Sequence, residues 1–111
     1  MEIRQKIISF DFDETLCDSQ GNPIKKYIKK LIKHHKNNDK IIITTFRRHS
    51  SKNHVEDFIE KYNLPVEEIV CTEHQPKLPF LMRKNAAIHY DDDIPTINSL
   101  LNSGIIGKLV N

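Results

Sequence analysis

The stretch IISFDFDETL, at residues 7–16, decides the predicted fold. Its first half is apolar at nearly every position apart from Ser9, which is typical of a strand buried in a parallel sheet. Asp11 and Asp13 follow this run, one residue apart. Two like charges held close together at the end of a buried strand repel each other unless a cation offsets them. We therefore expect a cation to bind beside the two acids, or the two acids to take part in a reaction.

Composition restricts the class of protein. The chain has 111 residues, which suits one domain over residues 1–111, and its 38% hydrophobic and 29% charged residues are those of an ordinary globular protein. A formal net charge of +2 tolerates phosphate-bearing partners without requiring nucleic acid. No apolar run approaches the ~20 residues of a membrane span. Cys17 and Cys71 match neither a metal pattern nor a disulfide framework, so we expect a cytoplasmic protein with no membrane partner.

Apolar runs alternate with helical patterns along the whole chain. Strands are predicted at residues 6–12, 40–45, 67–72, 86–90 and 107–110, and helices at residues 24–36, 53–62, 78–84 and 94–101. This alternation predicts an α/β fold, a three-layer Rossmann-like domain with a mostly parallel sheet of about five strands and helices on both faces. In such sheets ligands bind at the carboxyl ends of the strands.

Polar residues follow each of the first four predicted strands. They are Asp11 and Asp13 after the first, Thr44, Thr45 and Arg47 at the second, Lys77 after the third, and Asp91, Asp92 and Asp93 after the fourth. Several carboxylates on one edge call for a divalent cation, and all-oxygen ligation suits Mg²⁺. A threonine hydroxyl and a lysine can then hold a phosphate, while one aspartate attacks phosphorus and another moves the proton. The pattern predicts phosphoryl transfer through an aspartyl-phosphate.

The same motifs resemble those of the haloacid dehalogenase (HAD) superfamily of phosphohydrolases. DFDET at residues 11–15 is similar to its DxDxT signature, and IIITT, a lysine at a helix start and AIHYDDD follow in the order of its other three motifs. The resemblance implies that Asp11 is the nucleophile and Asp13 the general acid/base. It implies that Thr45 and Lys77 bind the phosphoryl group. It also implies that Mg²⁺ takes the Asp11 carboxylate, the Asp13 backbone carbonyl and one acid of the last motif.

Some assignments within this resemblance stay open. DDDIPTI aligns without a gap to the family's GDSxxDI, which places Asp92 on the metal, Asp91 as the supporting or alternative ligand, and Asp93 pointing away. The sequence TFR fits the second motif with Thr45 as the phosphate hydroxyl, leaving Thr44 as its alternative, and Arg47 as a residue that reaches the substrate. Lys77 competes with Lys84, and its position 14 residues before Asp91 favours it.

No segment is long enough for a cap domain, which in this superfamily closes over small substrates. An uncapped edge is similar to members that act on bulky phosphorylated substrates such as nucleic-acid ends or phosphoproteins, and other members use an oligomer partner as the lid. We therefore expect a Mg²⁺-dependent phosphomonoester phosphatase of an accessible substrate, such as a nucleotide, a nucleic-acid end or a phosphoprotein. Nucleic acid enters only as substrate.

Two other readings compete with this function. A receiver-type phosphoacceptor also uses acids, a threonine, a lysine and magnesium, but its phosphoacceptor lies on the third strand. A catalytically idle phosphate-binding module of the same fold would be marked by loss of Asp11 or Asp13, and both are present. The basic run KKYIKKLIKHHK at residues 25–36 is interpreted as the solvated side of an amphipathic helix, and His89 as a packed histidine inside its strand.

Overall fold

The computed structural model describes residues 5–111, and within them strands and helices alternate as predicted. The strands are β1 (Ile7–Phe10), β2 (Lys40–Thr45), β3 (Glu68–Cys71), β4 (Ala86–Asp91) and β5 (Ile106–Leu109). The helices are α1 (Lys25–Lys36), α2 (Lys52–Lys61), preceded by a 3₁₀ turn at His49–Ser51, α3 (Leu78–Arg83) and α4 (Ile94–Ser99). No helix of residues 5–111 is long and apolar enough to cross a membrane.

The five strands form one parallel sheet in the order β3-β2-β1-β4-β5. The chain builds outward from β1 to β3 on one side and then crosses over to β4 on the other. Ser9 on the central strand is thereby flanked by Ile42 on β2 and by His89 on β4. Ligand sites of open α/β sheets lie where the strand order reverses in this way, here between β1 and β4. The predicted fold class is confirmed.

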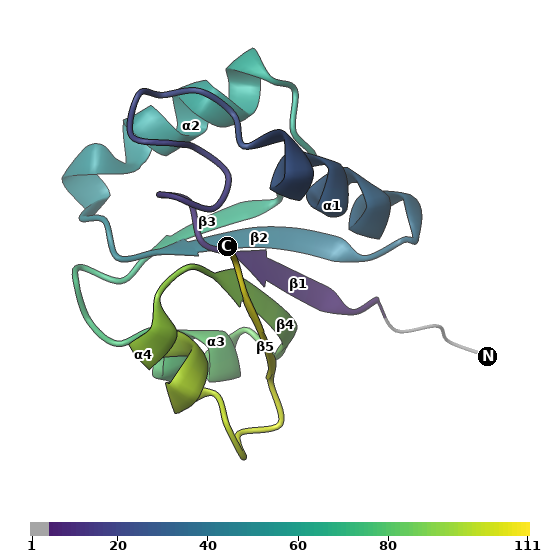
Figure 1. Ribbon diagram of the computed structural model, residues 1–111, viewed down its shortest axis with the longest axis vertical. Helices are drawn as coiled ribbons and strands as arrows, with labels where there is room; N and C mark the ends of the chain where they lie inside the picture. Colours follow the sequence, from purple (N-terminus) through teal and green to yellow (C-terminus); the bar gives the residue numbers. More distant parts are fainter. Residues whose placement is uncertain (1–4) are drawn as a thin grey trace.

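Helices cover both faces of the sheet, α1 and α2 on one and α3 and α4 on the other (Figure 1). The face toward α1 and α2 carries most of the apolar core, including Ile8, Phe10, Ile41, Ile43, Leu31, Val55 and Phe58. The face toward α3 and α4 has a smaller apolar cluster of Leu81, Ala86, Leu100 and Ile105. Because side chains alternate along a strand, Ser9 points away from the first face. It is fully buried, as is His89, so the second face holds polar groups in its middle.

The chain leaves the sheet sooner than predicted after the first strand. β1 ends at Phe10, and the amides of Thr15, Leu16 and Cys17 all donate to the carbonyl of Phe12. These bonds close a tight turn in which Glu14 adopts a left-handed φ of 60°. The alternation of a strand, which would point the side chains of Asp11 and Asp13 to the same face, therefore does not extend to this segment. Within residues 5–111 no cap domain is inserted between β1 and α1 or after β2.

Candidate active site

A buried lysine bridges two acids at the carboxyl ends of the central strands. Asp11 directly follows β1, Asp91 is the last residue of β4, and Lys77 directly precedes α3. The Nζ atom of Lys77 lies 2.9 Å from Oδ1 of Asp11 and 2.6 Å from Oδ2 of Asp91. The side chains of Lys77 and Asp91 are 0% exposed, and that of Asp11 is 8% exposed. The rival lysine, Lys84, instead pairs with Glu68 at a site where both side chains are 40% exposed.

The two bridged carboxyl groups have opposite protonation preferences. Burial raises the pKa of Asp11 to about 8, with the nearby Asp91 and Asp92 adding to the shift and Lys77 opposing it. Burial alone would also raise the pKa of Asp91, but the hydrogen bonds from His89 and Lys77 and the positive charge of Lys77 lower it below its usual value. Paired acids whose pKa values are driven apart are typical of sites that carry out acid–base or nucleophilic chemistry.

Three acids at this edge could together hold a metal ion. Asp11, Asp91 and Asp92 each offer one carboxylate oxygen, and these atoms all lie within 4.8 Å of one another. An all-oxygen set suits Mg²⁺, and a divalent cation would offset the charge that these acids share. Oδ2 of Asp91 accepts from both Lys77 and His89 and its Oδ1 accepts from the Asp93 amide, whereas Asp92 is exposed. Hydrogen bonds on both oxygens thus restrain the Asp91 carboxylate, whereas the Asp92 side chain is open to solvent.

Asp93 stands outside this group of acids. Its side chain caps α4, where Oδ2 accepts from the amide and from the hydroxyl of Thr96 at 3.1 and 2.6 Å. The carboxylate is therefore committed to the start of the helix.

The second aspartate of the DxD motif has a different environment from the first. The Arg47 guanidinium donates to both oxygens of Asp13, from Nε at 2.9 Å and from Nη2 at 2.8 Å, and lies over the Phe12 ring. The Asp13 side chain is 53% exposed. Asp13 thus lies at the solvent edge of the site while Asp11 is enclosed. Arg47 is brought into the candidate site through Asp13.

The two threonines of β2 lie on opposite faces of the sheet. The Oγ1 atom of Thr45 accepts from the amide of Arg47 at 3.2 Å, at the end of the strand. The Oγ1 atom of Thr44 is hydrogen-bonded to Oγ of Ser9 at 2.8 Å, on the face toward α3 and α4. This interior contact occupies the Thr44 hydroxyl and leaves Thr45 as the better placed of the two for a phosphate.

Three residues in contact with the site were not given a role from the sequence. Thr15 donates to Oδ2 of Asp11 at 3.4 Å. The imidazole of His89 contacts Oδ2 of Asp91 through Nε2 at 2.8 Å and Oγ of Ser9 through Nδ1 at 2.9 Å. One signal was available in the sequence, because a spacing of two residues on a strand places His89 and Asp91 on the same face.

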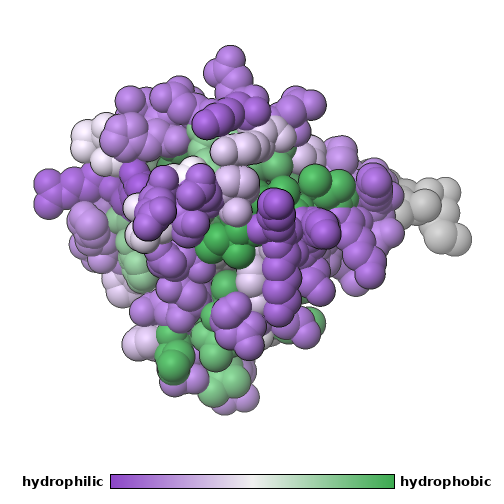
Figure 2. Space-filling model, turned by 45° about the horizontal axis from the view of Figure 1, so that its top comes forward, coloured by the Kyte–Doolittle hydropathy of each residue, from purple (hydrophilic) through white to green (hydrophobic). Residues whose placement is uncertain are grey.

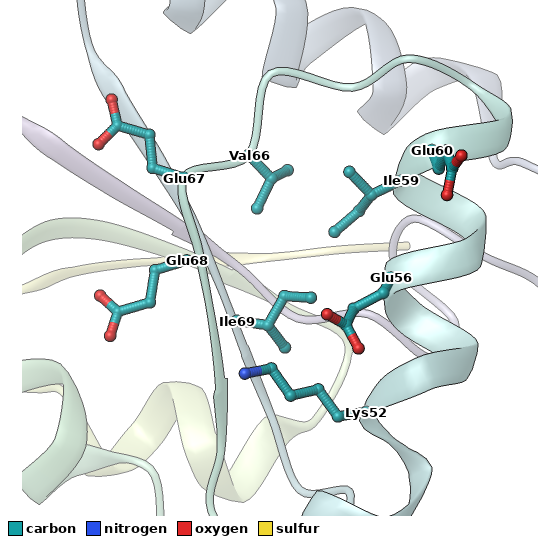
Figure 3. A pocket seen from close by; sticks show the side chains of 8 residues that line it. All are labelled: Lys52, Glu56, Ile59, Glu60, Val66, Glu67, Glu68 and Ile69. Carbon is teal, nitrogen blue, oxygen red and sulfur yellow. The ribbon is translucent and has the colours of Figure 1, made fainter.

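Hollows in the surface show where there is space. One of about 390 Å³ lies between α2 and β3, where Ile59, Val66 and Ile69 point inward, and no candidate site residue lines it (Figure 3). Another, of about 300 Å³, is lined by Lys77 together with residues that include Phe46 and His74. The second hollow therefore offers space beside the candidate site, and the first does not.

An all-parallel α/β sheet with a buried acid, a bridging lysine and further acids at one edge is compatible with a hydrolytic enzyme. The sequence model of the haloacid dehalogenase-like hydrolases matches residues 8–73, more than half of the chain, so the chain belongs to that family. This finding confirms the predicted family and the prediction that the protein is a hydrolase. None of the curated proteins matches this chain in sequence.

Solved structures share the fold. A chain of the Pnkp1/Rnl/Hen1 RNA repair complex aligns with a TM-score of 0.83 at 15% identity, over 96% of this chain and 42% of that one. A chain in a second structure of the Pnkp1/Rnl/Hen1 complex aligns with a TM-score of 0.82, again at 15% identity, over 96% of this chain and 46% of that one. The present chain thus spans less than half the length of these chains. At this level of identity the likeness establishes the fold alone.

Proposed function

We propose that the protein is a Mg²⁺-dependent phosphomonoester phosphatase that works through an aspartyl-phosphate on Asp11, with residues 1–111 as one catalytic domain. The observation that carries this proposal is the buried Lys77 between Asp11 and Asp91. A lysine at this place brings a fixed positive charge to the acid that would face a phosphate. Membership of a hydrolase family supports the reaction type.

In the proposed first step, an oxygen of ionised Asp11 forms a bond to phosphorus while the bond from phosphorus to the leaving oxygen breaks. Protonated Asp13 gives its proton to that oxygen, so an alcohol leaves. In the second step Asp13 takes a proton from water, the water oxygen bonds to phosphorus, and the bond to Asp11 breaks. Inorganic phosphate is released, Asp11 is restored as a carboxylate, and Asp13 is again protonated.

The contact between Arg47 and Asp13 bears on this proton transfer. Arg47 donates to both oxygens of Asp13, so it must leave one of them before that oxygen can carry the proton of the first step. We infer that a substrate phosphate draws Arg47 away and thereby releases Asp13 to take up a proton. Thr45 and Lys77 would hold the remaining phosphate oxygens, and the Thr44 hydroxyl would stay on Ser9.

The acids fit a hard divalent cation. Asp11 and Asp92, with the backbone carbonyl of Asp13, would hold Mg²⁺, and Asp91 would support them. When bound, the cation supplies positive charge that lowers the repulsion between the acids and a phosphate. Because the pKa of Asp11 is raised to about 8, Asp11 must lose a proton to become both ligand and nucleophile.

A phosphorylated nucleic-acid end is the substrate that the surface favours. Helix α1 contains no acid and exposes six lysines, which are Lys25, Lys26, Lys29, Lys30, Lys33 and Lys36. The side of the molecule that carries α1 and α2 is mainly hydrophilic (Figure 2). A dense positive face attracts polyphosphate backbones. Two chains of similar fold belong to an RNA repair complex, which agrees with this choice.

The buried free thiols of Cys17 and Cys71 agree with a cytoplasmic location.

The test is release of phosphate from an aryl phosphate, followed by a panel of nucleotides, phosphopeptides and 3′- or 5′-phosphorylated oligonucleotides. Wild type should require Mg²⁺, and Asp11→Asn should be inactive. Turnover that survives chelation would exclude the metal role, and turnover by Asp11→Asn would exclude the nucleophile. A receiver-like or idle module would give no turnover with any member of the panel.

A further inference from the structure

A line of buried polar side chains runs across three neighbouring strands and ends at the candidate site. Oγ1 of Thr44 on β2 lies 2.8 Å from Oγ of Ser9 on β1, which lies 2.9 Å from Nδ1 of His89 on β4. Nε2 of His89 lies 2.8 Å from Oδ2 of Asp91. All four residues are at most 1% exposed, so each hydrogen bond forms away from solvent.

The direction of each hydrogen bond follows from the acid at the end of the line. The Asp91 carboxylate is ionised and can only accept, so Nε2 of His89 must donate to it. The only hydrogen-bond partner of Nδ1 among residues 5–111 is the Ser9 hydroxyl, which can donate to it, so we assign Nδ1 as an acceptor. Ser9 must then donate to Nδ1, and Thr44 must donate to Ser9. The line therefore has one consistent direction and specifies one tautomer of His89.

We propose that His89 is a positioning residue for Asp91, held in its Nε2–H tautomer by Ser9 and Thr44. This role rests on the proposed phosphatase function, because a fixed orientation of Asp91 matters for the Mg²⁺ that it would support and for Lys77, which it contacts. Asp91 receives hydrogen bonds on both oxygens, and rotation of its carboxylate would break the contacts with His89, Lys77 and the Asp93 amide together. His89 thereby fixes Lys77 at the distance from which it also reaches Asp11.

A purely structural role explains this line less well. The neighbour of Ser9 on β2, Ile42, shows that this face accepts an apolar side chain. Burying a hydroxyl or an imidazole without a partner costs roughly 1–3 kcal/mol. An apolar residue in place of Ser9 or His89 would avoid that risk to the stability of the fold. Every buried side-chain polar atom among residues 5–111 has a partner, so the polar line is complete. Its one charged end is Asp91.

The decisive comparison uses two substitutions, each of which replaces the hydrogen bond of only one of the two ring nitrogens of His89. His89→Gln can still place an amide donor near Asp91, whereas His89→Asn is shorter and can reach only Ser9. Mg²⁺ alone is titrated by calorimetry into both variants and wild type, and kcat and KM are measured with an aryl phosphate. We expect His89→Asn to weaken Mg²⁺ binding and lower kcat by about 10–100-fold, as loss of an outer-shell partner does, with little change in KM. His89→Gln should lie closer to wild type.

The tautomer is tested without any variant, by long-range ¹H–¹⁵N spectra of the wild-type imidazoles at neutral pH. We expect His89 to be neutral with its proton on Nε2. A proton on Nδ1, or a His89→Asn variant that binds Mg²⁺ and turns over as well as His89→Gln, would overturn the proposal. If wild type binds Mg²⁺ but releases no phosphate, the phosphatase function fails while the tautomer and the metal titration still decide the role of His89.

Discussion

Replacing the proposed nucleophile should make the metal-free protein more stable although it abolishes activity. The pKa of Asp11 is raised from 3.8 to about 8, chiefly by burial. Between these values the folded protein binds a proton that the unfolded chain does not, so the free energy of unfolding falls as pH rises through this window. At pH 7, roughly three pH units above the unfolded value, the cost is about 4 kcal/mol at 1.36 kcal/mol per unit.

An asparagine has no proton to gain and avoids this cost. In Asp11→Asn the pair between Lys77 and Asp91 remains, so no buried charge is left alone. We expect Asp11→Asn to exceed wild type by up to about 4 kcal/mol near pH 7, and the gain to vanish as pH falls toward the unfolded pKa.

Urea denaturation in the presence of a chelator, near pH 7 and again near pH 4.5, measures the two differences. Asp57→Asn, at an exposed position on α2, is the matched control and should show no such pH-dependent gain. A variant no more stable than wild type near pH 7, or a gain that stays constant down to pH 4.5, would refute a raised pKa at Asp11.

Four further outcomes follow from the same contacts. Lys77→Met should unfold more easily by about 3–5 kcal/mol near pH 7, measured by urea denaturation, because it leaves the buried, ionised Asp91 without its lysine. Mg²⁺ affinity, measured by calorimetry, should rise up to tenfold per pH unit between about pH 6 and pH 8, since Asp11 releases its proton on binding; a flat profile would contradict this. Arg47→Ala should change stability by at most about 1 kcal/mol, because its pair with Asp13 is partly exposed, but should raise KM for an aryl phosphate. Lys29→Glu with Lys33→Glu should slow dephosphorylation of an oligonucleotide and flatten its salt dependence while aryl phosphate turnover stays unchanged; equal losses on both substrates would count against an α1 binding face.

The order of elements was predictable because buried parallel strands have a simple signature. The run KIIITT contains no charged residue after Lys40 and became β2 with the predicted bounds, residues 40–45. The gathering of Asp11, Lys77 and Asp91 was also predictable, since parallel strands bring their carboxyl ends to one edge. Lys77 was separable from Lys84 by its distance along the chain from the last motif.

The separation of Asp11 from Asp13 was not predictable by the same means. The period of two that describes a strand gives no warning that β1 ends at Phe10. The turn depends on several amides converging on the Phe12 carbonyl and on a left-handed Glu14, a conformation that sequence rarely signals at a residue other than glycine, asparagine or aspartate. Contacts between distant segments, not local pattern, place Asp13 on Arg47.

His89 shows how far a local interpretation can go. The expectation of a packed histidine was right about its burial, because an apolar strand leaves little room for an exposed side chain. It could not reveal the function of the packing, since the partners Ser9 and Asp91 become neighbours only when β1 and β4 pair. A polar residue in a buried strand, two positions before a candidate metal acid, should therefore be examined as a support for that acid. Burying the imidazole of His89 carries a cost in stability. Its contact with Asp91, which pairs with Lys77 and is proposed to support Mg²⁺, explains that cost better than the stability of the sheet does.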